Sequence, residues 1–481
     1  MPRPSILLFA LVWLSAAWFG SWHWNPNSAV RLFAAIGIVE RHDAAIDRFE
    51  ALTIDKARFG AHFYLDKPPG MTLMAMPVVA LTDAATGDSA EDKVLATTDP
   101  VFDRYMKLRQ WLAAAAINAT LLALAAVALM DIGRRVTGSA GAGAFGALAF
   151  ALGTPLWGWA TTLFGHCAVA SLLVIAVRLV LKGTGDDRSR ADAPLAGLAL
   201  GWALVIEHSA LLFALPVGIF ALWRLRAAPR IEAARAAGGA VLAGTAAMIP
   251  LLAYNLFAFG TPFRLGYEGV VGWEGMQQGL FGLTYPHVAV LGEVLAGTHR
   301  GMLWVAPVLL AALPGLWLLW RRGWRDLAVL AAVGAAAAFL YNASYVYWDG
   351  GNSTGPRHAM PAVAFLSLAL PGVWAAAGLA GRAALSALLA GSVAINLTIA
   401  AAEITAPWSA DNALVDGVWR ERFWPGYLRT VPNEFFGWTP WQGLAMWAVA
   451  AAALFAALMF ALSRQPQSAN IYRTDGAARR S

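Results

Sequence analysis

Acidic and basic side chains are interleaved in one polar stretch near the start of the chain, residues 23–109. Two aspartate–lysine pairs stand between residues 43 and 67, where the charged set of interest is Asp43, Asp47, Asp55, Lys56, Asp66 and Lys67. A lysine or arginine can hold a phosphate group, and a nearby carboxylate can take the proton from a hydroxyl. The stretch therefore contains both kinds of group that a transfer from a phosphate to a hydroxyl needs. Charges in a loop also simply solvate it, so the charges alone leave both interpretations open.

A rigid turn follows the aspartate–lysine pair at 66–67. Residues 68–70 read Pro-Pro-Gly, a combination that restricts the backbone and favours a turn. We expect this turn to aim Asp66 and Lys67 as the chain returns to the apolar stretch 71–82. That stretch is too short to cross a bilayer, so it is predicted to be re-entrant or interfacial.

Apolar residues recur through 28–40 at helical spacing. This pattern predicts an amphipathic helix lying on the membrane surface, with Arg31 near its start. Asn27 or Ser28 is expected to cap it.

The composition indicates a membrane protein. The chain has 481 residues, of which 59% are apolar and 13% are charged, whereas soluble proteins are roughly 45–50% apolar and about 25% charged. The single cysteine, Cys167, excludes a disulfide framework and a cysteine-based metal cluster. The net charge of +6 comes from arginines next to apolar runs, which is an orientation signal, so no nucleic-acid partner is expected.

The apolar runs predict an all-α polytopic membrane protein with about twelve spans (roughly 11–13), given a bilayer core of about 30 Å. The stretch 194–223 is interpreted as two short helices that meet at a polar apex, Glu207 and His208. The other predicted spans are 5–22, 110–131, 140–162, 165–182, 238–258, 301–320, 326–344, 358–380, 384–403 and 441–462.

The short loops on one side carry the arginines, which places that side in the cytoplasm. Both termini then lie inside, including a polar tail at 464–481. The first run is interpreted as an uncleaved span, with a signal peptide as the alternative. One membrane domain is expected over 1–481, with external loops at 23–109, 259–300 and 404–440.

Several segments, in chain order, resemble GT-C glycosyltransferases that use polyprenyl-phosphate sugars, a group related to the lipid A aminoarabinose transferase and the protein O-mannosyltransferases. The first loop carries the pattern N-S-x-x-R, V-E, I-D, D-K-A and Y-x-D-K-P-P-G between Asn27 and Gly70. Four later segments continue the resemblance, which covers roughly 20–440: FGH at 164–166, NLFAFGTPFRLGY at 255–267, THRGMLWVAP at 298–307 and WDGGNSTGPR at 348–357.

The resemblance implies a GT-C fold with interfacial helices in the first external loop. It also implies transfer of a sugar from a carrier such as undecaprenyl phosphate to a lipid, glycan or protein, on the periplasmic face of a bacterial inner membrane. A single displacement would invert the anomeric carbon, with a carboxylate as base. The donor is the lipid-linked sugar, and no cofactor is expected. Some relatives use divalent ions, but no ligand cluster with convincing spacing is visible, so no metal is predicted.

The resemblance also assigns roles to individual residues. Lys67, Arg31 and Arg357 match positions near the carrier phosphate, and Lys56 is grouped with them. Six further residues are expected to contact substrate, although a structural role is open for the histidines and a membrane anchor for the arginine: Tyr64, His166, Glu207, His208, Tyr267 and Arg300.

The base is where the sequence departs from its relatives. Many of them have an acidic pair directly after the first span, where this chain has Asn27 and Ser28. The base must then come from later in the loop, with Asp55 the first choice, Asp47 the second and Asp66 the third.

Three other functions compete with this one. A transporter or flippase of lipid-linked glycans would explain twelve spans, but not the charged first loop. An O-antigen ligase or polymerase usually has its large loop late in the chain. A non-catalytic assembly subunit would explain the missing acidic pair.

Overall fold

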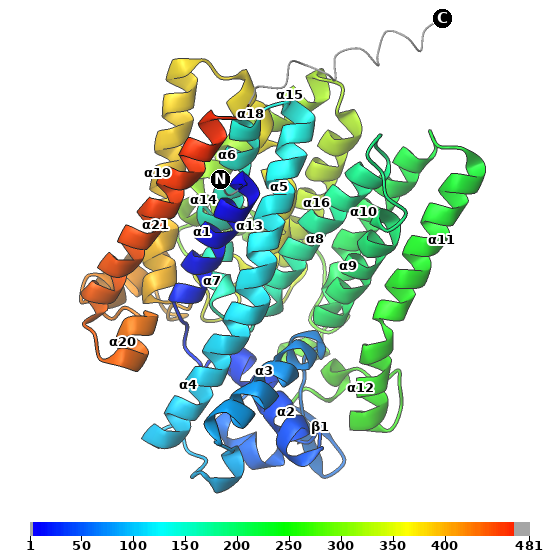
Figure 1. Cartoon of the computed structure of the whole chain (residues 1–481). Coiled ribbons are helices and arrows are strands. Elements are labelled where there is room, and N and C mark those ends of the chain that lie inside the picture. Colours follow the sequence, from blue (N-terminus) through cyan, green and yellow to red (C-terminus); the bar gives the residue numbers. More distant parts are fainter. Residues whose placement is uncertain (1–2, 466–481) are drawn as a thin grey trace, which may run out of the picture.

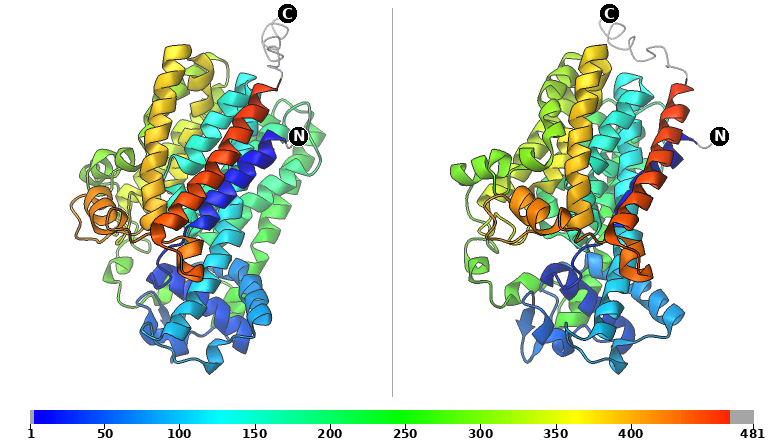
Figure 2. Two further views of the ribbon diagram at one scale, coloured as in Figure 1. Left: turned by 60° about the vertical axis from the view of Figure 1, so that its left-hand side comes forward. Right: turned by 90° about the vertical axis from the view of Figure 1, so that its left-hand side faces the viewer.

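The computed structural model describes residues 3–465. All but the first two residues of the predicted cytoplasmic tail, 464–481, lie outside this range. The chain forms a bundle of long helices with a smaller layer of short elements at one end (Figure 1), and the same two parts are visible from the side (Figure 2). Residues 23–99, which make most of the small layer, are called the loop layer below.

The bundle confirms the prediction of an all-α polytopic membrane protein. Eight helices of the described chain are long and apolar enough to cross a membrane: Pro100–Thr137, Gly165–Gly183, His208–Leu225, Arg230–Phe259, Arg325–Ser344, Arg357–Ala376, Leu379–Ala402 and Pro440–Ser463. Shorter apolar helices accompany them: Pro4–Trp18, Gly70–Thr86, Ala140–Leu152, Asp192–Ile206 and Pro307–Arg321. The number of spans, about twelve, stays a prediction because several of these helices are short for a full crossing.

The labels of Figure 1 divide these segments further. The first half of the bundle comprises α1 (Pro4–Trp18), α4 (Pro100–Ala114), α5 (Thr120–Thr137), α6 (Ala140–Leu152), α7 (Leu156–Ala160), α8 (Gly165–Gly183), α9 (Asp192–Ile206), α10 (Leu211–Leu225), α11 (Arg230–Ala247) and α12 (Ile249–Phe259). The second half comprises α13 (Val288–Ala296), α14 (Met302–Val305), α15 (Ala312–Arg321), α16 (Arg325–Ser344), α17 (Met360–Ser367), α18 (Leu370–Ala376), α19 (Leu379–Ala402), α20 (Val431–Phe436) and α21 (Pro440–Ser463).

Two features of the bundle position the site. Helices α4 and α5 are joined by a π-helical turn, Ala115–Ala119, so one continuous helix runs from the loop layer into the bundle (Figure 1). The stretch 194–223 is indeed divided, because Glu207 adopts an extended backbone (φ −147°) between α9 and α10. The polar apex predicted there is therefore confirmed.

The loop layer contains α2 (Pro26–Arg41), a hairpin of β1 (Ala57–Phe59) and β2 (His62–Tyr64), and α3 (Gly70–Thr86). The cap predicted for the helix at 28–40, which is α2 in the structure, is wrong. The side chain of Asn25 accepts a hydrogen bond from the Asn27 backbone N–H at 3.1 Å, and Pro26 occupies the first turn.

The predicted helix is confirmed, but other protein elements cover most of it, and its place at the membrane surface stays a prediction. All residues from Ser28 to Gly37 are buried, because α3 and α4 pack against α2. The stretch 71–82 forms most of α3 within the same layer.

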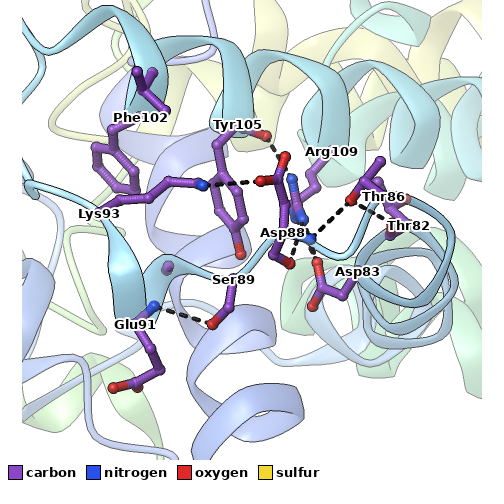
Figure 3. Close-up of polar contacts among 12 residues, drawn as sticks. Thr82, Asp83, Thr86, Asp88, Ser89, Glu91, Lys93, Phe102, Tyr105 and Arg109 are labelled. Atoms are coloured by element: carbon purple, nitrogen blue, oxygen red, sulfur yellow. Dashed lines mark hydrogen bonds and ion pairs between the residues drawn. The ribbon is translucent and has the colours of Figure 1, made fainter.

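A buried polar cluster ties the loop layer to α4 (Figure 3). The Arg109 guanidinium is fully buried, donates to Asp83 of α3 at 2.8 Å and lies 3.4 Å from the centre of the Tyr105 ring. The Tyr105 hydroxyl donates to Glu40 of α2 at 2.6 Å. A buried charge is tolerated when it is paired and hydrogen-bonded. This cluster therefore fixes α2 and α3 on the continuous helix, and with them the residues of the site.

Candidate active site

A cavity of about 500 Å³ lies between the loop layer and the adjoining ends of the membrane helices. Elements far apart in the sequence supply its polar lining. Most of the site residues predicted from the sequence line it, namely Arg31, Asp55, Asp66, Lys67, His166, Glu207, Tyr267 and Arg357. Ordered loops join the layer to the later parts of the chain. For example, the backbone N–H of Val271 donates to the Lys56 carbonyl at 3.1 Å.

Lys67 is held between two carboxylates. Its ammonium nitrogen lies 3.1 Å from Asp55 Oδ2 and also contacts Asp66. Burial lowers the pKa of Lys67, but the two carboxylates outweigh burial, so its pKa is raised and it stays charged. Burial raises the pKa of Asp66, and the Lys67 charge opposes that rise. The turn at 68–70 thus brings Asp66 and Lys67 into the cavity together.

Arg31 joins the loop layer to the apex of the α9–α10 pair. One guanidinium nitrogen donates to Glu207 Oε1 at 2.9 Å, and the other donates to the Asn27 carbonyl oxygen at 3.0 Å and to its side-chain oxygen. The side chain is 1% exposed. Its Nε has no hydrogen-bond partner within the described chain, and a buried donor without a partner is costly. Arg31 therefore lines the cavity with a guanidinium that already bonds Glu207 and Asn27.

Arg357 is the cavity cation without an ion pair among residues 3–465. Its Nε lies 3.4 Å from His358 Nε2, and its guanidinium carbon lies 5.3 Å from the centre of the Phe164 ring. The side chain crosses Gly350, where an added Cβ would lie 2.9 Å from Arg357 Cγ. The φ angle of Gly350, +68°, also favours glycine.

Four tyrosines also line the cavity, Tyr267, Tyr341, Tyr345 and Tyr347. Burial raises the pKa of Tyr267 well above its usual value, and it raises the pKa of Tyr345 to about 12. Both hydroxyls are therefore protonated at neutral pH and available as donors. The Tyr345 ring lies 4.8 Å from that of His358.

Two predicted residues of the first loop point away from the cavity. Asp47 contacts the exposed His62 imidazole at 2.6 Å and accepts a hydrogen bond from the Phe63 backbone. Lys56 donates to the Glu50 backbone at 2.9 Å. Asp55 and Lys56 directly precede β1, and only Asp55 is among the lining residues. Asp55 therefore faces the cavity and Lys56 does not.

Three further predicted residues lie near the cavity without lining it. Tyr64 packs against Phe259, with ring centres 5.5 Å apart. His208 lies behind Tyr267, with ring centres 5.9 Å apart. Arg300 is buried and donates to backbone carbonyls of the loop that follows α16.

Sequence reasoning missed part of the lining. The residues not singled out include Asn25, Tyr341, Tyr345, Tyr347, Asp349 and His358. Asp349 belongs to the same WDGGNSTGPR segment as Arg357, and His358 follows that segment directly. The signal was therefore present but was interpreted for the arginine alone. Among the described residues, no three His, Cys, Asp or Glu side chains are grouped as a metal site.

No protein-family model and no curated protein matches the sequence. Solved structures do match. ArnT from Cupriavidus metallidurans bound to undecaprenyl phosphate has a TM-score of 0.50 and 15% identity, over 95% of this chain and 73% of that one. ArnT from the same organism in the apo state has a TM-score of 0.49 and 19% identity, over 82% and 63%.

The archaeal oligosaccharyltransferase AglB from Archaeoglobus fulgidus, in complex with an inhibitory peptide and a dolichol-phosphate, has a TM-score of 0.41 and 14% identity, over 82% of this chain and 55% of that one. The chain thus spans less than two thirds of the length of AglB and of apo ArnT. The match to lipid-bound ArnT confirms the predicted GT-C fold.

Proposed function

We propose that this chain is a GT-C glycosyltransferase that moves a sugar from a polyprenyl-phosphate carrier to an acceptor hydroxyl. The observation that carries the proposal is the cavity, which gathers Arg31, Lys67 and Arg357 beside Asp55 at the ends of membrane helices. Cations at that level suit a lipid whose phosphate lies at the membrane boundary. The ArnT structure with the same fold holds undecaprenyl phosphate, which supports the same class of carrier here.

The three cations differ in how far they are already neutralised. In the described chain Arg357 has no ion pair and Arg31 has one, with Glu207, whereas Lys67 contacts two carboxylates. We therefore assign the first phosphate contacts to these two arginines. Lys67, which is 3.1 Å from Asp55, stands between the phosphate and the base. Bidentate arginine contacts would hold the leaving group in line.

Asp55 is the base in this proposal. The acceptor hydroxyl attacks the anomeric carbon, Asp55 takes the proton, and the bond between that carbon and the phosphate oxygen breaks. The electron pair leaves with the phosphate, whose charge is stabilised by the cations. The attack and departure occur on opposite faces, so the anomeric configuration inverts. Asp66 lies deeper and holds Lys67, and Asp47 lies outside the cavity.

The remaining assignments extend this proposal. The acceptor is a lipid, glycan or protein presented at the periplasmic face of a bacterial inner membrane, and both termini are cytoplasmic. Undecaprenyl phosphate is the expected carrier lipid. No resident cofactor takes part in the scheme.

The test is release of polyprenyl phosphate from a panel of labelled polyprenyl-phosphate sugars by purified protein in nanodiscs. Asp55→Asn is expected to lower turnover roughly 10²–10⁴-fold with carrier binding kept, because it removes the base. Lys67→Met is expected to weaken carrier binding. Asp92→Asn and Arg58→Ala, exposed residues of the loop layer, are the matched controls and should behave as wild type.

Folding of every variant is checked by thermal unfolding, since Lys67→Met leaves two carboxylates without their cation. Full turnover by Asp55→Asn would reject the assigned base. If the wild type processes no sugar of the panel but moves labelled carrier across a vesicle bilayer, the chain is a flippase.

A further inference from the structure

Asp349 differs from the other carboxylates of the cavity. Asp55 and Asp66 bind Lys67, and Glu207 binds Arg31. The half-buried Asp349 carboxylate lines the same cavity but makes no ion pair or hydrogen bond within residues 3–465. An ionised carboxylate offers acceptor sites only. It is therefore free to accept hydrogen bonds from a bound molecule.

The backbone on either side of this carboxylate is held firmly. Arg300, which is 1% exposed, donates to the carbonyl of Asp349 at 3.0 Å, of Gly351 at 2.7 Å and of His299 at 3.1 Å. Gly350 lies against the Arg357 side chain. A binding group on a fixed loop loses little conformational freedom when the ligand arrives. Asp349 is thus preorganised beside Arg357, the cavity cation that has no ion pair within residues 3–465.

Three aromatic residues, Tyr347, Trp273 and Trp408, line the same cavity as Asp349. Tyr347 and Trp273 pack edge to face with ring centres 5.2 Å apart, and the Tyr347 hydroxyl oxygen accepts a hydrogen bond from the Gly275 N–H at 2.9 Å. Trp408 lines the cavity although it is 71% exposed. A sugar ring offers hydroxyl donors at its edge and an apolar C–H face, which are complementary to a carboxylate and to aromatic rings respectively.

The charges of the lining restrict the kind of sugar. The cavity is lined by four carboxylates and three lysine or arginine side chains. A carrier phosphate adds further negative charge, and like charges close together repel each other. A sugar that carried its own carboxylate would be repelled by this excess of negative charge next to Asp349.

We propose that Asp349, with Trp273, Tyr347 and Trp408, forms the subsite for the sugar ring of the donor, and that this sugar has free hydroxyl groups and no carboxylate. This inference rests on the proposed transferase function and names the residues of the cavity that recognise the sugar. Arg300 acts through Asp349 as a positioning residue. The phosphate contacts are assigned to other residues of the lining, Arg31, Lys67 and Arg357.

The test compares binding of undecaprenyl phosphate with binding of undecaprenyl-phosphate glucose, mannose, galactose and glucuronic acid to the full chain in nanodiscs. The wild type is expected to bind at least one neutral-sugar carrier more tightly than undecaprenyl phosphate. Asp349→Asn should weaken that complex roughly 10-fold or more, since bonds to a charged group are the stronger ones, and should leave undecaprenyl phosphate binding within about twofold.

Two matched controls separate the subsite from general effects on the surface. Trp408→Ala should lose affinity for the same carrier, whereas Trp424→Ala, which removes a ring of similar exposure (67%) that is not part of the lining, should not. Asp92→Asn is the carboxylate control. If the wild type gains no affinity from a neutral sugar, prefers the glucuronic acid carrier, or is unaffected by Asp349→Asn, the subsite is refuted. If it binds no polyprenyl phosphate at all, the proposed function itself fails.

Discussion

Gly70 is placed where the loop layer touches the membrane helices, and its replacement by alanine tests how the site is held. It is the first residue of α3, directly after the two prolines. A Cβ at this position would lie 2.7 Å from main-chain atoms of Val205 and Ile206, at the end of α9, whereas ordinary contact begins at 3.4 Å. The two elements would therefore have to separate by about 0.7 Å. Because the atoms met are backbone, no side chain can turn aside to make room.

The expected cost has two parts. Overpacking of this kind typically destabilises a protein by about 1–3 kcal/mol. The separation also moves Lys67, which precedes the turn, away from Glu207, which follows α9. A misplacement of about 1 Å can lower a rate about 10²-fold. We therefore expect Gly70→Ala to lose roughly 10- to 100-fold in kcat/KM together with a lower Tm.

The assay is tryptophan fluorescence during heating, combined with release of carrier phosphate from the labelled donor. Gly218→Ala is the matched control, because a Cβ there meets nothing within 4 Å in α10. In a helix this change should stabilise by about 0.5–1 kcal/mol. If Gly70→Ala keeps the Tm and turnover of the wild type, the close approach of α3 to α9 does not position the site.

Two further substitutions test neighbouring contacts. Arg109→Leu leaves Asp83 without its cation and is expected to lower the free energy of unfolding by about 3–5 kcal/mol. Denaturant unfolding in detergent measures this loss. An unchanged unfolding midpoint would show that the cluster of Figure 3 is not stabilising. Glu207→Gln removes the negative charge that neutralises the Arg31 guanidinium. It should tighten binding of undecaprenyl phosphate several-fold in calorimetry, and weaker binding would mean that Glu207 is needed to orient Arg31.

The apolar runs predicted the membrane helices because burial in lipid leaves a strong mark on composition. The break at Glu207 and His208 was visible for the same reason, since charged groups interrupt an apolar helix only at a cost. Helix caps, and the packing of other elements over a helix, are harder to predict from the sequence. Asn25 was missed as the cap of α2 because it follows a tryptophan-rich stretch that resembles the end of a span. The burial of α2 depends on α3 and α4, which a single helix pattern does not show.

The site was predictable where the local backbone was predictable. The Pro-Pro-Gly turn predicted that Asp66 and Lys67 are aimed together, and both line the cavity. Lys56 was misplaced because the short strand that follows it left no signal, and a shift of one residue in an extended chain reverses the side that a residue faces. Asp349 was not singled out because only the folded chain reveals that its carboxylate has no partner within residues 3–465.

The bond between Arg31 and Glu207 joins residues 176 positions apart in the chain, and this separation affects biogenesis. At translation rates of about 5–20 residues per second, Glu207 is synthesised on the order of 10 to 35 seconds after Arg31. Until then Arg31 has its hydrogen bonds to Asn27 but lacks the carboxylate that neutralises its charge, and the loop layer stays incomplete. We expect a nascent chain stalled before residue 207 to be cut in this layer by an added protease, whereas a longer nascent chain that includes the α9–α10 pair should resist it. The ion pair would then mark the point in synthesis at which the half-built cavity becomes protected.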